Sequence, residues 1–315
     1  MTEFDKKGSE AARAAWLYYH EELTQSEIAQ ELSISRSTVT RLLQRAKSEG
    51  LVQISLNVTS GTFKAERELE QRYGLRRVRI VPDAADEATQ KRWLGHAAAE
   101  LTVSMVKDNS IIAVSWGTTL LAMADSLIGQ HPLSNAQVVA VLGGLHNAMP
   151  GADTNEVAKR LGQFFNAPVR PLLAPMSVQD EATAAGLAHD PGIRDALELA
   201  RNASIVIYSL GSTDDETTLF KLGHLDAGQW DFLKRHGAVG DIACRWIDAK
   251  GDPIALPPSV NPIGIDLDEI KKIPERLAVV GGAHKSEIAL AGLRGGFVTT
   301  LVTDERTAAF LLTPR

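Results

Sequence analysis

Residues 23–56 read LTQSEIAQELSISRSTVTRLLQRAKSEGLVQISL, and this stretch decides the fold of the N-terminal region. Thr24 followed by Glu27 fits a capping box, in which the two side chains satisfy free backbone N–H groups at a helix start. The pattern predicts a helix from residue 25 to about residue 32, with Ile28 facing inward. The stretch therefore opens with a short helix whose beginning is well specified.

A second helix follows after a short turn. Ser35 fits its N-cap, and apolar residues at helical spacing predict that it runs over residues 36–48. Residues 11–20 also show helical spacing, and residues 51–56 alternate like a half-buried strand. Three short helices and a strand indicate a helix-turn-helix with a small wing.

Positive charge gathers on the helix expected over residues 36–48. Residues 1–33 carry three basic and seven acidic side chains, whereas residues 34–60 carry four basic side chains and one acid. The outward face of that helix offers Arg, Gln, Ser and Thr, which are common partners of bases and phosphates. The alternative is a small helical bundle with a solvated basic face. We predict the following DNA contacts: Ser35, Arg36, Ser37, Thr40, Arg41, Gln44 and Arg45, with Lys47 as a further backbone contact.

Composition restricts the class of protein. The chain has 315 residues, 44% hydrophobic and 23% charged, with a formal net charge of −6. Cys244 is the single cysteine, so neither an intrachain disulfide nor a cysteine-based zinc cluster is expected. No apolar run reaches the length of a membrane span, and the N-terminus lacks a signal-peptide core. These features predict a cytoplasmic protein.

The remaining chain is expected to form a large α/β domain. We assign residues 1–58 to a DNA-binding domain, 59–74 to a linker helix and 75–315 to an effector-binding domain. Short apolar runs alternate with helical stretches in the last of these, which indicates a doubly wound parallel sheet. The predicted strands are 78–81, 111–115, 138–142, 169–173, 205–209, 277–281 and 298–302. The predicted helices are 87–106, 118–128, 154–165, 192–202, 228–236, 285–293 and 305–312.

Glycines follow several of the predicted strands. In a doubly wound sheet ligands bind beyond the carboxyl ends of the strands, and glycine allows backbone N–H groups to approach a ligand closely. Helix N-termini at that edge favour an anion such as phosphate. Lys285 lies at the start of a helix, where a bound anion would stabilise it. The candidates at this edge are Gly117, Thr118, Thr119, Gly143, Gly144, Gly211 and Lys285.

The stretch over residues 23–56 closely resembles the DNA-binding segment of the SorC family of sugar-binding transcriptional regulators. The segments SWGTTL, VLGGL, NEVAKRLGQFF, ALELARNASIVIYSLGS, GAVGDIACRWIDAKG and VVGGAHKSEIALAGLRGGFVTTLVTDE resemble its effector domain in order and spacing. The resemblance covers nearly the full chain. It implies a sugar-phosphate-isomerase-like fold that has become a sensor, and a homotetramer that regulates an operon for carbohydrate or polyol use. A repressor is one interpretation of this role, and an activator stays open.

The resemblance also implies roles for individual residues. Gly117, Thr118 and Thr119 would hold a phosphate with Lys285 as its charge partner. Gly143 and Gly144 would line the pocket, Asp241 would accept hydrogen bonds from sugar hydroxyls, and Asn155 is a further polar candidate. Many relatives carry arginine where this chain has Thr118, so an unphosphorylated polyol stays open as the effector.

An enzyme with the same pocket is the main alternative. An isomerase or deaminase needs a positioned general acid or base, and Asp241 is the one carboxylate we would nominate. The chain shows no metal-binding spacing such as HExxH. An architectural nucleic-acid-binding protein would need a basic stripe that the large domain lacks. We therefore expect a regulator that binds double-stranded operator DNA and a sugar or sugar-phosphate effector, with no catalytic residues, metal or cofactor.

Overall fold

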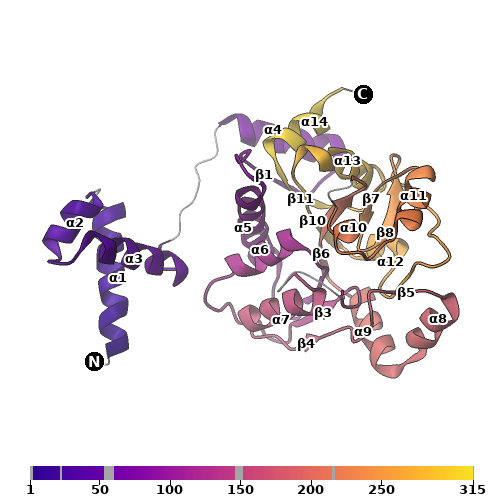
Figure 1. Cartoon of the computed structure of the whole chain (residues 1–315), viewed down its shortest axis with the longest axis horizontal. Coiled ribbons are helices and arrows are strands. Elements are labelled where there is room, and N and C mark those ends of the chain that lie inside the picture. The colour runs from indigo at the N-terminus through magenta and orange to yellow at the C-terminus, as the bar shows by residue number, and fades with distance from the viewer. Residues whose placement is uncertain (1–2, 22, 53–59, 146–151, 215–216, 315) are drawn as a thin grey trace. The chain divides into compact units, whose positions relative to one another are not determined.

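The computed structural model describes residues 3–21, 23–52, 60–145, 152–214 and 217–314 (Figure 1). The chain divides into two compact units, residues 1–57 and 58–315. Within the described residues, no helix is long and apolar enough to cross a membrane. The strand expected over residues 51–56 falls mostly outside the described residues.

Three helices form the small unit: α1 (Glu3–Tyr19), α2 (Gln25–Glu31) and α3 (Arg36–Ser48). The predicted capping box of Thr24 and Glu27 is confirmed, and Ser35 caps α3 as expected. Ala14, Ile28 and Val39 are fully buried at the centre of the core. Helix α1 begins eight residues before the predicted start at residue 11, because the charged residues at its beginning carry no apolar stripe.

A nine-stranded sheet forms the centre of the large unit. Seven strands are parallel, in the order β1–β11–β10–β6–β2–β3–β4. Their bounds are β1 Arg77–Val81, β2 Ile111–Val114, β3 Gln137–Ala140, β4 Val169–Arg170, β6 Ile205–Ser212, β10 Glu275–Val279 and β11 Thr300–Asp304. All seven predicted strands are present, in the predicted order along the chain. This confirms the doubly wound α/β fold.

Helices cover both faces of this sheet, and two hydrophobic cores lie between them and the strands. Ile112 and Val114 face the core formed with α5, α6 and α7, whereas Ala113 faces the core on the opposite side. Figure 1 shows α5, α6 and α7 together on one side of the sheet. The helices are α4 Ser60–Tyr73, α5 Glu87–Met105, α6 Thr118–Ser126, α7 Thr154–Phe165, α8 Glu181–His189, α9 Pro191–Arg201, α10 Thr218–Lys221, α11 Ala227–Arg235, α12 Leu267–Lys272, α13 Ser286–Arg294 and α14 Glu305–Leu312, with a 3-10 turn, η1, at Ala283–Lys285.

An antiparallel hairpin extends the sheet where the sequence predicted no strand. Strand β7 (Ala238–Ile242) pairs with the end of β6, and β8 (Arg245–Asp248) pairs with β7. The turn between them has Ala243 and Cys244 at φ 49° and 61°. Such turns normally use Asn and Gly, so the sequence carried no hairpin signal here. A separate ribbon pairs β5 (Ser177–Val178) with β9 (Asn261–Pro262).

Helix α4, which the sequence assigned to a linker, packs onto the large unit beside α14 (Figure 1). Its Leu69 is fully buried in the core. The Arg72 guanidinium donates hydrogen bonds to the carbonyl oxygens of Leu312 and Thr313, at 2.6 and 3.1 Å. The helix is therefore an integral part of the large unit.

Candidate ligand pocket and nucleic-acid interface

A pocket lies beyond the carboxyl ends of β2, β6 and β10. The chain leaves β2 toward one edge of the sheet and leaves β6 toward the other, so the pocket is at the switch in strand order where ligands of such folds bind. Six of the nine predicted effector contacts line it: Gly117, Thr118, Thr119, Gly211, Asp241 and Lys285. Segments far apart in the sequence thus supply one site.

The N-terminus of α6 opens into this pocket. Gly117 is its N-cap residue at φ 130°, and it offers no side chain to cap the first turn of the helix. A Cβ atom at Gly117 would lie 2.9 Å from the Ser209 hydroxyl, so both the backbone angle and the space favour glycine. The N–H groups of the first turn, which the N-cap residue does not cap, and the hydroxyls of Thr118 and Thr119 make this end suited to an anion.

Asp241 provides a buried carboxylate on β7. Only 4% of the residue is exposed, and the backbone N–H of Cys244 donates to its Oδ2 atom at 2.9 Å. Burial raises the pKa of Asp241 to about 6, although the Cys244 N–H and nearby Lys285 both oppose the rise. A Cβ atom at Gly211, which pairs with Asp241 in the sheet, would lie 2.0 Å from Oδ1. Glycine at residue 211 therefore makes room for this carboxylate.

Lys285 ends η1 and is the N-cap residue of α13. Burial lowers the pKa of its ammonium group, and Lys91 lowers it further, while Asp241 and Glu87 act in the opposite direction. The Lys285 side chain does not cap the first turn of α13. The ammonium group thus lies in the field of one neighbouring lysine and of three carboxylates, those of Asp241, Glu87 and Asp214.

Sequence reasoning missed three charged residues of the pocket: Glu87, Lys91 and His284. Glu87 and Lys91 begin α5, which precedes β2 in the chain. Their spacing of four residues is typical of ion pairs on any solvent-exposed helix, so nothing in the sequence pointed to a pocket. Trp116 and Ser209 also line the site.

Three predicted effector contacts lie elsewhere. The Asn155 side chain accepts a hydrogen bond from the Leu172 N–H at 3.0 Å and donates to the Leu172 carbonyl oxygen at 3.4 Å. A Cβ atom at Gly143 would lie 2.3 Å from the carbonyl oxygen of Pro175, and Gly144 pairs with Pro175 in a β-bridge. These residues hold the loops after β3 and β4 together and do not line the pocket.

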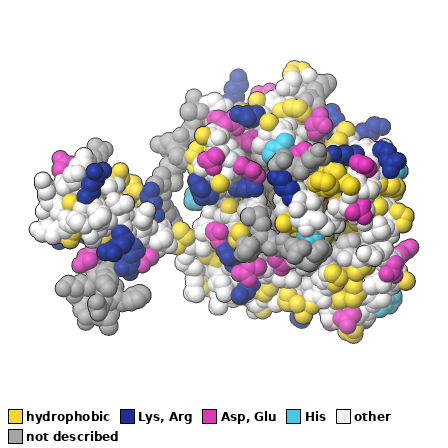
Figure 2. All heavy atoms as spheres, in the orientation of Figure 1, with side chains coloured by type: hydrophobic (Ala, Val, Ile, Leu, Met, Phe, Trp, Pro, Cys, Tyr) yellow, Lys and Arg dark blue, Asp and Glu magenta, His cyan; other side chains and the backbone are white. Residues whose placement is uncertain are grey.

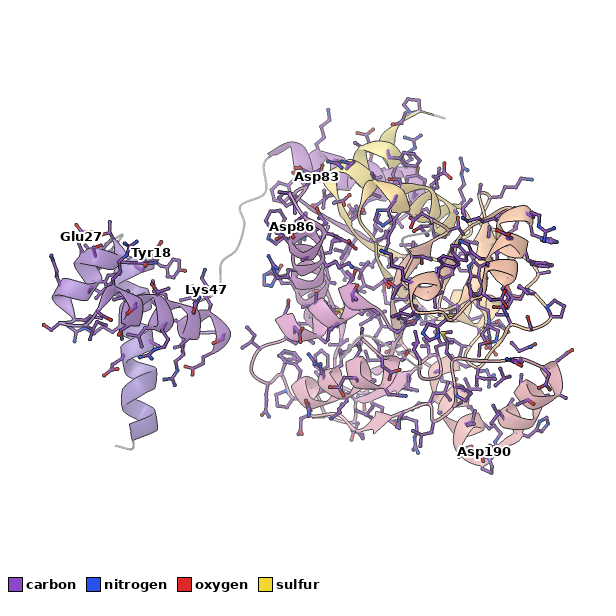
Figure 3. All side chains as sticks on the ribbon, in the orientation of Figure 1. Tyr18, Glu27, Lys47, Asp83, Asp86 and Asp190 are labelled. Atoms are coloured by element: carbon purple, nitrogen blue, oxygen red, sulfur yellow. The ribbon has the colours of Figure 1, made fainter. Side chains whose placement is uncertain are left out.

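Helix α3 presents the predicted DNA-contacting face to solvent. The side chains on this face are exposed at Arg36, Ser37, Thr40, Arg41 and Gln44. Figure 2 shows Lys and Arg side chains in dark blue on the small unit, and Figure 3 labels Lys47 at the end of α3. The recognition helix is the second helix of a helix-turn-helix, here α3, and it requires a polar, basic stripe on its N-terminal part.

Other predicted contacts already have partners within the unit. The Ser35 hydroxyl accepts a hydrogen bond from the Thr38 N–H at 3.1 Å, and the Arg45 Nε donates to Glu49 at 2.6 Å. Thr40 donates to the Gln25 side chain at 3.0 Å and so joins α3 to α2. Gln25, which the sequence did not single out, therefore lies beside the exposed face of α3.

Among the described residues, no group of three or more His, Cys, Asp or Glu side chains could hold a metal ion. The pocket offers hydroxyl, amide, ammonium and carboxylate groups from several different loops. Its chemistry suits a small polar ligand with a negatively charged end and hydroxyl groups.

Comparison with known proteins agrees with both units. Residues 58–313 match the sugar-binding domain family, and residues 10–59 match the MarR family. Transcriptional regulator LsrR of Escherichia coli K12 is 32% identical over 308 residues, which span 96% of this chain and 94% of LsrR. LsrR of Enterobacter sp. strain 638 is 30% identical over 306 residues, with 96% and 92% covered.

The fold is also similar to a solved structure. The full-length sorbitol operon regulator SorC from Klebsiella pneumoniae has a TM-score of 0.74 and 23% identity, covering 98% of this chain and 100% of that one. The sequence relatives are named transcriptional regulators, so this chain is a transcription regulator with a helix-turn-helix and a sugar-binding domain, and not an enzyme. The chain belongs to the SorC family of sugar-binding transcriptional regulators.

Proposed function

We propose that a sugar phosphate or related polyol binds the pocket at β2, β6 and β10 and thereby controls the binding of operator DNA by α3. One observation carries this proposal: the N-terminus of α6, where Gly117 offers no capping side chain, opens into the same pocket as Lys285 and Asp241. The helix N-terminus and the Lys285 ammonium group would hold a phosphate, and the Asp241 carboxylate would accept hydrogen bonds from sugar hydroxyls. The effector is the one small molecule that the proposal requires.

On the DNA side, we propose that Arg36, Ser37, Thr40, Arg41 and Gln44 contact bases or adjacent phosphates, because their side chains are exposed on one face of α3. Ser35 and Arg45 would act at the edge of this contact, since each has an intramolecular partner. We leave Gly143, Gly144 and Asn155 out of the proposed effector site.

Coupling between the two sites requires that the effector bind one conformation of the large unit better than another. A ligand with equal affinity for both conformations would shift nothing. We propose that the protein acts in the cytoplasm, where operator DNA is found, as a homotetramer that places recognition helices on operator half-sites. By analogy with the name of the sorbitol operon regulator, the controlled genes would form a carbohydrate or polyol operon, with the protein as its repressor.

A ligand screen tests the proposal. Purified full-length protein is heated with a panel of sugar phosphates and polyols, and each compound that raises the melting temperature is added to a gel-shift assay with promoter DNA. We expect at least one compound to stabilise the protein and to change its operator affinity without being consumed.

Lys285→Ala is the matched variant for this screen. We expect it to bind the operator like the wild type but to lose the ligand response, because it removes a cation from the pocket and leaves α3 unchanged. Lys107→Ala, on an exposed lysine that does not line the pocket, is the control and should keep the response. A Lys285→Ala protein that still responds fully to the wild-type ligand would contradict the proposed site.

A further inference from the structure

Two lysines and a histidine gather at one end of the proposed effector pocket. Lys91 extends from α5, and His284 and Lys285 come from η1. All three line the pocket, and all three also line an adjoining cavity at the ends of β1, β10 and β11. Burial lowers the pKa of Lys285, and Lys91 lowers it further, while the carboxylates of Asp241, Glu87 and Asp214 act in the opposite direction.

Glu87 forms an ion pair with one of these side chains, Lys91. Its Oε1 atom lies 2.6 Å from the Lys91 Nζ, across one turn of α5. The pKa of Glu87 is lowered chiefly by its hydrogen bond with Lys91, and also by the charges of His284 and Lys285. The carboxylate therefore lies close enough to Lys91, His284 and Lys285 for all three to favour its ionised form.

The Glu87 side chain is largely exposed, so moving it away from Lys91 would cost little packing. It is 72% exposed, whereas the side chain of Lys91 is 29% exposed. Asp86, labelled in Figure 3, already caps α5 by accepting a hydrogen bond from the Thr89 N–H at 2.8 Å, so Glu87 is not needed as the cap. Asp241 cannot move in the same way, because it is buried and bonded to the Cys244 N–H.

We propose that Lys91 is a further effector-binding residue, and that Glu87 is an internal anion that pairs with Lys91 until the phosphate of the effector displaces it. The inference rests on the proposed function, since it assigns a second cation to the phosphate end of the same pocket. Glu87 competes with every anion that enters and so raises the effector concentration that the regulator needs. A dianionic phosphate group, which interacts with the cations more strongly than one carboxylate does, overcomes this competition.

The proposal predicts opposite effects for two neighbours in one ion pair. Glu87→Gln removes the competitor and should tighten phosphate binding about two- to fivefold, the range that an exposed ion pair provides. Lys91→Met removes a cation that contacts the ligand and should weaken binding about tenfold or more. In the Lys91→Met background, Glu87→Gln should have a smaller effect than in the wild type.

Calorimetric titration of the full-length chain with inorganic phosphate measures these changes, at about pH 8 where the phosphate is mainly dianionic. Inorganic phosphate has no sugar hydroxyls, so a direct contact of Glu87 with the sugar does not affect the result. Glu156→Gln is the control, because Glu156 also lies in the first turn of a helix, pairs with Lys159 and Arg160, and does not line the pocket. It should bind phosphate like the wild type.

The outcomes separate the two proposals. If the wild type binds phosphate and Glu87→Gln binds it with the same or lower affinity, Glu87 is not an internal anion. The proposed effector site is not affected by that result. A loss of affinity in both single variants would show that the pair is merely structural and would likewise overturn the inference. If neither the wild type nor Glu87→Gln bound phosphate or any sugar phosphate, the proposed function itself would fail, and the inference with it.

Discussion

Asp241→Asn should make the protein more stable at neutral pH while removing its response to the effector. The rise of the Asp241 pKa from 3.8 to about 6 means that ionisation costs more in the folded chain than in the unfolded chain. At about 1.4 kcal/mol for each pH unit, this rise corresponds to about 3 kcal/mol. Asparagine carries no charge, so it avoids this cost and still offers an oxygen to the Cys244 N–H. Its NH2 group needs a new acceptor, which reduces the expected gain to about 1–3 kcal/mol.

The pH dependence follows from the direction of the pKa shift. Because the folded pKa is higher than the ordinary value, the protonated carboxyl stabilises the folded chain below about pH 4, and this stability is lost as the pH rises through about 6. The advantage of Asp241→Asn should therefore be full at about pH 8 and fall to about half near pH 5.

Urea unfolding of the large unit, measured for both proteins at these two pH values, gives the free energies to compare. The same two proteins are then tested in the gel shift with an effector found by the ligand screen. Two results would refute the reasoning that burial penalises the ionised carboxylate. One is an Asp241→Asn protein that is less stable than the wild type at about pH 8. The other is a difference in unfolding free energy between the two proteins that is the same at both pH values.

Three further substitutions have distinct readouts. Arg41→Ala should weaken operator binding and reduce the slope of log affinity against log salt by about 1, so an unchanged slope would remove Arg41 from the proposed phosphate contacts. Leu69→Ala should lower the free energy of unfolding of the large unit by about 2–5 kcal/mol, because Leu69 is fully buried in its core; an effect confined to the small unit would contradict the assignment of α4. Gly211→Ala should abolish the thermal shift caused by the effector, because its Cβ would lie 2.0 Å from Asp241 Oδ1; a normal shift would mean that Asp241 does not contact the ligand.

Features set by neighbours in the chain could be predicted from the sequence. The caps at Thr24 and Ser35 depend on atoms within three residues, and the apolar spacing of α3 depends on the helical repeat. The alternation of apolar runs with helices likewise indicated the parallel sheet and the edge at which a ligand would bind. Gly117, Thr118, Thr119 and Lys285 were placed at that edge for this reason, and the structure brings all four to one pocket.

Features set by contacts between distant segments needed the tertiary structure. Glu87 and Lys91 look like an ordinary surface pair in the sequence, and only the packing of α5 beside η1 brings them to the pocket. Gly143 follows the same pattern as the pocket residues, and the family resemblance pointed to Asn155, yet the loops of these two residues hold one another. The sequence by itself determined the elements, the capped α3 and the ligand-binding edge, because each depends on local periodicity and backbone hydrogen bonding. Which charged groups meet at that edge was decided by the fold alone, because charges interact through space and not along the chain.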